Sequence, residues 1–337
     1  MSKARIDLID FVKGFSILTI VVMHYLQDLD LSSIVMKLSA FGGAGVHAFI
    51  FISGFGLYLS HDRNPLPYLS FLRRRFIKIY FPYAIAVLII AGIDYYLDYN
   101  EPSIYKIASH LLLFKMFNEE LMISFGYHFW FISTIIQLYL TFPLFVSIRD
   151  RFGNRWLMVI TISVSLLWGA TTAALDKQEM RIWNSFFLQY VWEFALGICL
   201  ASVYLKKGYA VWETRWPKLI GVTVVGLALY GALPIAFGEV GKLFNDFPAL
   251  VGYLGTAILL YRCAPMPIRS FMNWIGSISY AFYLFHLILM EIFGRAYQNG
   301  FGRPLDFLWM VASIAITLPI SAYAQKGITW LYAKLKL

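Results

Sequence analysis

Lys13 and His24 are the residues of the first hydrophobic segment whose types could do chemistry. Ten residues separate them in KGFSILTIVVMH. Eleven helical positions turn the chain by about 1100°, so both side chains fall within ~20° of one helix face and ~16 Å apart along the axis. Imidazole titrates near neutral pH and can take a proton from a hydroxyl, which makes His24 a candidate general base. Lys13 offers a fixed positive charge for an anionic or thioester-bearing ligand.

Each of these two residues also has a structural interpretation. Asp10 precedes Lys13 by one helical turn, a spacing at which the two can form a local salt bridge that only helps the helix to enter the membrane. His24 could be an interfacial histidine that bonds to a neighbouring helix. Against this, ionisable groups are costly inside a bilayer, and their presence there is a reason to expect function.

The composition of the chain indicates that these residues lie in a membrane. The chain has 337 residues, of which 60% are hydrophobic and only 14% are charged, and its mean hydropathy is +0.66. This excludes a soluble globule and predicts an all-α, polytopic integral membrane protein. Because ~20 apolar residues cross the hydrocarbon, the sequence predicts about ten transmembrane helices, near 8–26, 41–60, 79–97, 126–148, 155–175, 185–205, 217–237, 247–263, 270–293 and 307–326.

The segments between these helices are short. Stretches 64–78 and 103–117 are too polar to cross and are expected to be amphipathic segments along the membrane surface. No repeat, low-complexity linker or long hydrophilic block interrupts the chain. We therefore expect residues 1–337 to form a single membrane domain with no appended soluble domain.

The positive charges predict the orientation of these helices. If the N-terminus is cytoplasmic, 19 of the 28 Lys and Arg residues lie on the cytoplasmic side, including Lys3, Arg5 and Lys336, and 8 lie on the outer side; Lys13 lies within the membrane. The positive-inside rule therefore places both termini in the cytoplasm of a cell-membrane protein, with His24 near the outer end of its helix and Lys13 towards the cytoplasm. The net charge of +9 thus reflects topology, and no nucleic-acid partner is expected.

The densest basic cluster is formed by Arg73, Arg74 and Arg75 in FLRRRFIKIYFP, on the predicted cytoplasmic side before the third helix. Such a cluster usually anchors a helix to anionic lipid headgroups. Guanidinium groups also suit bidentate recognition of phosphate. Charge alone favours the anchor.

Further polar residues lie in or near the apolar segments, and each also has a structural interpretation as an interfacial or packing residue. His286 is well within an apolar helix and needs a partner, for stability or for function. The candidates for binding a substrate are His47, His128, Trp130, Tyr280 and His286. The spacing of the two cysteines is not that of a zinc site, and no metal is expected.

Taken together, these segments resemble acyltransferase family 3, integral membrane enzymes that modify cell-surface polysaccharides and related envelope molecules. The first helix matches the family's Arg, ten residues, His layout, with Lys13 at the Arg position. GVHAFIFISGF resembles the family's Gly-Val-Asp-aromatic-Ser-Gly-aromatic segment, with His47 where Asp is common. Three more segments match in the family's order: LRRRFIKIYFPY, YHFWFI and ISYAFYLFH.

The resemblance implies an O-acyltransferase that uses a cytoplasmic acyl-CoA, with acetyl-CoA expected, and acts on a glycan or glycolipid on the outer side. It implies that Arg73, Arg74 and Arg75 meet the CoA phosphates, that Lys13 holds the donor, and that His24 acts at the thioester. Lysine keeps the charge of the family's arginine but loses its planar, two-pronged donor. His47, His128 and Tyr280 are second-rank candidates for binding the acceptor or orienting His24.

Two questions stay open at this level. His24 could activate the acceptor hydroxyl for direct attack, or it could carry the acyl group as an acyl-histidine. The alternative function is a translocator or export partner for a surface polysaccharide, with the polar residues lining a glycan path. A secondary transporter is disfavoured, because the sequence has no pair of corresponding broken helices. The oligomeric state and the identities of acceptor and acyl group are not encoded in any pattern we recognise.

Overall fold

The computed structural model describes residues 6–97 and 103–335; Lys3, Arg5 and Lys336 of the charge count lie outside these ranges. The described residues are helical along most of their length and contain no β-strand. Eight helical stretches among them are long and apolar enough to cross a membrane. The predicted all-α, polytopic membrane fold is therefore confirmed. The count of about ten crossings and the cytoplasmic position of both termini stay predictions.

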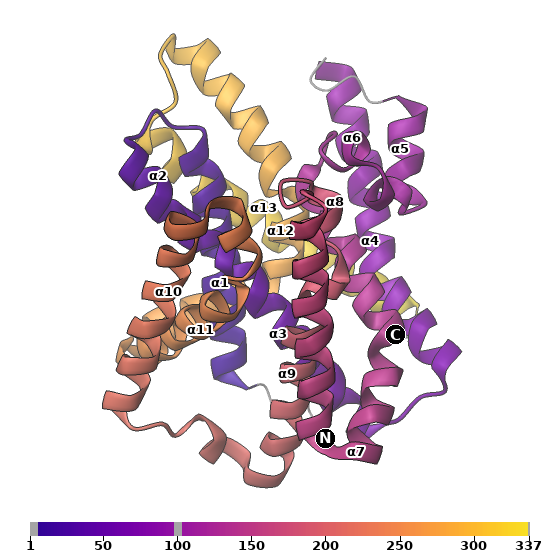
Figure 1. Ribbon diagram of the computed structural model, residues 1–337. Coiled ribbons are helices and arrows are strands. Elements are labelled where there is room, and N and C mark those ends of the chain that lie inside the picture. The colour runs from indigo at the N-terminus through magenta and orange to yellow at the C-terminus, as the bar shows by residue number, and fades with distance from the viewer. Residues whose placement is uncertain (1–5, 98–102, 336–337) are drawn as a thin grey trace. The chain divides into compact units, whose positions relative to one another are not determined.

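The chain divides into two compact units, whose helices are drawn in Figure 1. Unit 1 comprises Met1–Phe49, Pro217–Leu227 and Pro248–Leu337, and unit 2 comprises Ile50–Trp216 and Ala228–Phe247. Unit 1 is built from α1 (Asp7–Gln27), α2 (Ser33–Ser39), η1 (Ala40–Ala44), most of α11 (Asp246–Cys263), α12 (Met266–Phe301) and α13 (Phe307–Lys334). Unit 2 is built from α4 (Tyr68–Leu97), α5 (Ile104–Leu111), η2 (Phe114–Phe117), α6 (Glu119–Met122), η3 (Tyr127–Phe129), α7 (Trp130–Ala174), α8 (Arg181–Asn184), α9 (Phe187–Lys207) and η4 (Gly208–Trp212). Helices α3 (Gly45–Arg63) and α10 (Trp216–Leu243) contribute to both units.

The core of unit 1 lies among α1, α12 and α13. Ile17, Val21 and Tyr25 recur at helical spacing on α1 and pack in one buried cluster with Phe282 of α12 and Trp309 of α13. The rings of Tyr25 and Trp309 lie 4.9 Å apart between centroids. Val21 and Tyr25 of this cluster flank His24 along α1.

The start of α13 is fixed by an N-cap. The Asp306 carboxylate accepts hydrogen bonds from the Trp309 backbone N–H at 2.9 Å and from the Tyr297 hydroxyl at 2.8 Å. A carboxylate at this position satisfies a backbone donor that has no partner within the helix. The bonds to Trp309 and Tyr297 hold the pKa of Asp306 below its usual value, the Trp309 N–H being the main cause.

In unit 2, a glycine separates two legs of α7. Gly153 has φ +81° within the range assigned to this helix, a backbone conformation that side-chain-bearing residues rarely adopt. The two legs correspond to the predicted helices 126–148 and 155–175. The first leg runs beyond its apolar part, through Arg149 and Asp150 to the break, because polar residues continue a helix that hydropathy alone would end.

The same effect lengthens other helices beyond their predicted ends. Helices α12 and α13 extend to Phe301 and Lys334, where hydropathy predicts ends at 293 and 326. Stretch 64–78 is not a separate surface element, because α4 begins at Tyr68 and runs without interruption to Leu97. Stretch 103–117 does form short helical pieces, α5 and η2.

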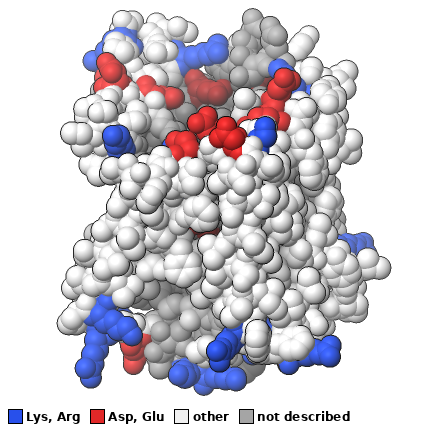
Figure 2. Space-filling model, in the orientation of Figure 1, with Lys and Arg blue, Asp and Glu red and all other residues white. Residues whose placement is uncertain are grey.

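The two ends of unit 2 differ in charge. Asn154 in α7 donates from Nδ2 to the Ser202 hydroxyl of α9 at 2.9 Å, which joins the turn of α7 to the basic end of α9. At the other end, Glu119 accepts the backbone N–H groups of Arg181 and Ile182 at 2.8 and 2.9 Å. Figure 2 shows mostly basic side chains at the end of the molecule where the α7 turn lies, and acidic side chains mixed with basic ones at the end where α8 lies. This asymmetry within unit 2 agrees in sense with the positive-inside count.

Candidate active site

Close packing of α1 against α12 positions the candidate site in unit 1. A Cβ atom on Gly14 would lie 1.9 Å from the Met272 carbonyl oxygen, and one on Gly276 would lie 2.1 Å from the Asp10 carbonyl oxygen. Only glycine allows the two backbones to approach so closely. The helices run parallel, because the contact of Gly14 with Gly276 and that of His24 with His286 follow in the same order along both helices. His24 comes ten positions after Gly14, and His286 comes ten positions after Gly276. The same step along both helices, ~15 Å, brings the two histidines to one level.

His24 and His286 are in direct contact at that level. Nδ1 of His24 lies 2.9 Å from Nε2 of His286, and the rings are nearly parallel, at 11°. His24 is 9% exposed and His286 is fully buried. The partner that a histidine deep in an apolar helix requires is thus His24 itself.

The neighbouring carbonyls define which nitrogen carries each proton. Nδ1 of His286 lies 3.1 Å from the Phe282 carbonyl oxygen and 2.9 Å from that of Tyr283. Since carbonyl oxygens only accept, Nδ1 of neutral His286 carries the hydrogen and its Nε2 accepts. Nδ1–H of His24 is then the donor of the histidine pair, and Nε2 of His24 carries the lone pair. A base oriented by a second group in this way suits proton abstraction from a hydroxyl.

Lys13 lies on the same helix as His24 and contacts Asp10. Its Nζ is 3.2 Å from the Asp10 carboxylate, and 32% of the Lys13 side chain remains exposed. The local ion pair considered from the sequence therefore exists. It does not occupy the whole ammonium group, which has three donors.

Arg73, Arg74 and Arg75 lie in the first turns of α4 in unit 2. Arg73 is exposed, whereas Arg74 and Arg75 are half-buried. The Arg75 guanidinium lies 5.8 Å from the centroid of the Phe71 ring. Its Nε is buried and has no hydrogen-bond partner among the described residues. A buried donor of this kind fits an anionic oxygen of a ligand better than a lipid-facing anchor.

The remaining predicted residues are dispersed. His47 lies in the first turn of α3 within unit 1. Tyr280 is on α12 six residues before His286, which places the two about 120° apart around that helix. His128 and Trp130 belong to unit 2; the His128 ring packs 4.1 Å from that of Phe129, and Trp130 stacks on Tyr190 at 6.2 Å. None of these contacts assigns a role in catalysis.

The sequence did not point to a buried basic pair in unit 2. His110 at the end of α5 and Lys115 in η2 are both fully buried. Nζ of Lys115 lies 3.4 Å from Nε2 of His110, and the Tyr83 hydroxyl lies 3.3 Å from Nδ1. Burial lowers the pKa of His110 to about 2 and that of Lys115 to about 7. Lys115 lies in LLLFKMF, within the stretch 103–117 that the sequence assigns to the membrane surface, so only the fold shows that its ammonium group is buried.

Comparison with known proteins identifies the family of the chain. The acyltransferase domain of family 3 matches residues 6–325. The curated protein "Putative acetyltransferase ORF330" of Acidianus two-tailed virus is 23% identical over 287 residues, which cover 84% of this chain and 83% of that protein. No solved structure matches the chain significantly. Because the family match extends over nearly the whole chain, this membrane protein belongs to acyltransferase family 3.

Proposed function

We propose that the protein transfers an acyl group, with acetyl expected, from a cytoplasmic acyl-CoA to a hydroxyl of a glycan or glycolipid on the other side of a cell membrane. The contact between His24 and His286 carries this proposal, because it supplies a base with an orienting partner inside a membrane helix bundle. Membership of an acyltransferase family and a relative named as an acetyltransferase support the reaction type.

In the proposed reaction, Nε2 of His24 takes the proton of the acceptor hydroxyl. The hydroxyl oxygen attacks the thioester carbonyl carbon, the new C–O bond forms, and the C–S bond breaks. The proton on His24 then passes to the departing sulfur, so that CoA leaves as a thiol. His286 accepts the Nδ1–H of His24 throughout and holds its ring in the reactive orientation. An acyl-histidine route would instead form a bond between His24 and the acyl carbon, and ping-pong kinetics would identify it.

Two groups of basic residues are proposed to bind the donor. Arg73, Arg74 and Arg75 would bind the CoA phosphates. The buried Nε–H of Arg75 is a donor of the kind that a phosphate oxygen accepts. Lys13 would meet the donor nearer the thioester, since it shares α1 with His24. Membrane lipids are the competing ligand for the arginines.

The test is acyl transfer by a variant that lacks the base. His24→Ala in producing cells should remove the acyl group from envelope glycans, as measured by mass spectrometry, while the protein remains inserted. His61→Ala is a matched control, because His61 lies on a membrane helix and packs against Phe142. Wild-type acylation by His24→Ala would remove His24 from the chemistry. Polymer trapped inside cells that lack the gene would favour the export function instead.

A further inference from the structure

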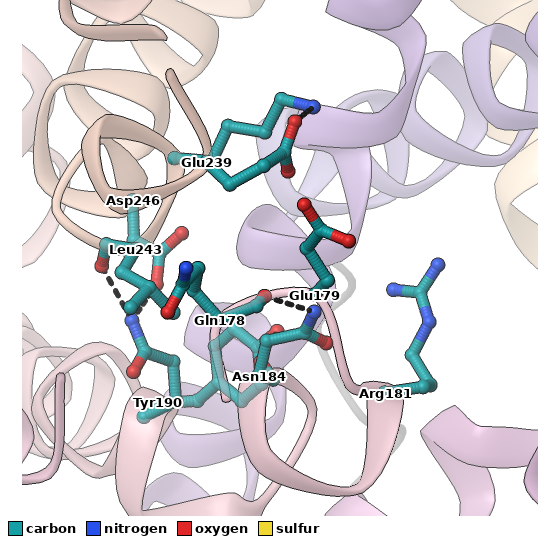
Figure 3. A pocket seen from close by; sticks show the side chains of 10 residues that line it. Gln178, Glu179, Arg181, Asn184, Tyr190, Glu239, Leu243 and Asp246 are labelled. Atoms are coloured by element: carbon teal, nitrogen blue, oxygen red, sulfur yellow. Dashed lines mark hydrogen bonds and ion pairs between the residues drawn. The ribbon is translucent and has the colours of Figure 1, made fainter. Parts of the chain in front are cut away.

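Unit 2 contains a cavity of about 580 Å³ that the proposed chemistry does not use (Figure 3). It lies among the loop before α8, the start of α9 and the junction of α10 with α11. Its volume falls within the range of small-molecule sites, which is roughly 300–1,000 Å³. The lining is unusual for such a site, because nearly every side chain in it is polar.

The lining side chains are fixed by hydrogen bonds among themselves. Nε2 of Gln189 donates to the Asp246 carboxylate at 2.7 Å and to the Leu243 carbonyl oxygen at 2.6 Å. The Tyr190 hydroxyl donates to the Asn184 carbonyl oxygen at 2.9 Å. Gln189 is 4% exposed, and its two hydrogen bonds hold its amide in place. Polar groups held in place before a ligand arrives lose little entropy on binding.

The charges of the lining are mixed and partly compensated. Glu239 pairs with Lys242 at 2.5 Å. Arg181 lies 5.6 Å from the Trp130 ring centroid, and Trp130 stacks on Tyr190. With Glu179 and Asp246, the cavity has three carboxylates and two cationic side chains. This composition disfavours a free anion, and the polar lining disfavours an apolar ligand.

A ligand with many hydroxyl groups meets these requirements. Carboxylates only accept hydrogen bonds, arginine and lysine only donate, and amides do both. A hydroxyl also does both, so each kind of lining group finds a partner in it. We propose that this cavity binds a saccharide, that is, a neutral ligand with several hydroxyls. That this saccharide is also the acyl acceptor rests on the proposed function.

Binding can be tested on the full chain in detergent, independently of acyl transfer. The probes are maltose and N,N′-diacetylchitobiose, with inorganic phosphate as an anion and spermidine as a cation, measured by saturation-transfer difference NMR and titration. We expect a saccharide to bind and Asp246→Asn to weaken its binding by about tenfold or more, because the carboxylate loses its charge as an acceptor. Glu120→Gln, which neutralises an exposed carboxylate outside the cavity, should leave binding unchanged.

Two further variants, Arg181→Gln and His24→Ala, complete the experiment. Arg181→Gln removes an exposed side chain of the lining and serves if Asp246→Asn does not fold. Binding of phosphate or spermidine without either saccharide, no binding at all, or saccharide binding that neither variant weakens would each overturn the proposal. His24→Ala should keep saccharide binding and lose acyl transfer. An active His24→Ala would refute the proposed function while leaving the saccharide site intact.

Discussion

The Nδ1 atom of His24 donates to Nε2 of His286 across the α1–α12 contact, although 262 positions separate the two residues in sequence. The backbone carbonyls of Phe282 and Tyr283 hold the far side of the His286 ring. The pair therefore has a direction, from the carbonyls through His286 to Nε2 of His24. That direction is the one that the proposed roles require, with His24 as the base and His286 as its positioning residue.

Replacing His286 tests this assignment. His286→Ala should lower kcat for acyl transfer by roughly 10²–10⁴-fold, because His24 loses both its orientation and the acceptor that stabilises its protonated form. The KM for acyl-CoA should change little, since His286 is not proposed to touch the donor. Purified protein and radiolabelled acyl-CoA would give both constants.

The control for this variant separates positioning from packing. His286→Gln offers an amide oxygen that can accept from His24, so it should recover part of the lost kcat, whereas His286→Leu fills the space and should not. Equal activity of the Gln and Leu variants would show that His286 acts only through packing.

The sequence supplied the two histidines separately but not their contact. His24 stood out through its spacing from Lys13, and His286 through its position in an apolar helix. Their pairing depends on the crossing of α1 and α12, which the two glycines permit only in combination. A single sequence does not show which of its many glycines face one another, so this relationship appears only in the folded chain.

Adding a methyl group at Gly14 should destabilise the protein. Gly14→Ala would place a Cβ 1.9 Å from the Met272 carbonyl oxygen, and relief requires α1 and α12 to move apart. We expect a cost of about 1–3 kcal/mol and a lower melting temperature in detergent. Because the histidine contact depends on the same crossing, acyl transfer should fall as well.

Gly221→Ala is the matched control for this change. Gly221 also lies in unit 1, within α10, and no atom would come within 4 Å of its added Cβ. Alanine favours a helix over glycine by roughly 0.5–1 kcal/mol, so this variant should be as stable as the wild type or more so. Similar losses in both variants would contradict the close-packing argument.

Lys13 should act on donor binding more than on stability. Lys13→Met should raise the KM for acyl-CoA by about tenfold or more, because a charge-assisted contact is lost. Lys13→Arg, which restores the residue of the family pattern, should keep activity. Asp10→Asn breaks the ion pair but keeps the ammonium, so its KM should remain close to that of the wild type. If Asp10→Asn and Lys13→Met behave alike, Lys13 serves only the local salt bridge.

Hydropathy predicted the helical segments well, but it could not predict what lies between them. The apolar parts of α7, α10, α12 and α13 were all identified, whereas the helical extensions beyond them depend on residues that are polar. The cavity in unit 2 brings Gln189 together with Glu239 and Asp246, which lie about fifty positions later in the chain. Each looks like an ordinary interfacial residue by itself, and only the fold brings Gln189 of α9 into contact with Leu243 and Asp246.

Lys115 should make stability depend on pH. Burial lowers the pKa of the folded-state ammonium from 10.5 to about 7, so between these values the unfolded chain binds a proton that the folded chain lacks. Stability should therefore rise with pH through this window, by up to about 1.4 kcal/mol per pH unit, and Lys115→Met should remove this dependence. Between pH 7 and pH 9, the melting temperature of the wild type should rise relative to that of Lys115→Met, with measurements at pH 7, 8 and 9. Lys207→Met, at an exposed lysine of α9, should run parallel to the wild type. If Lys115→Met also runs parallel, Lys115 keeps its proton in the folded protein, and the contacts with His110 and the Gly126 carbonyl are those of an ammonium ion.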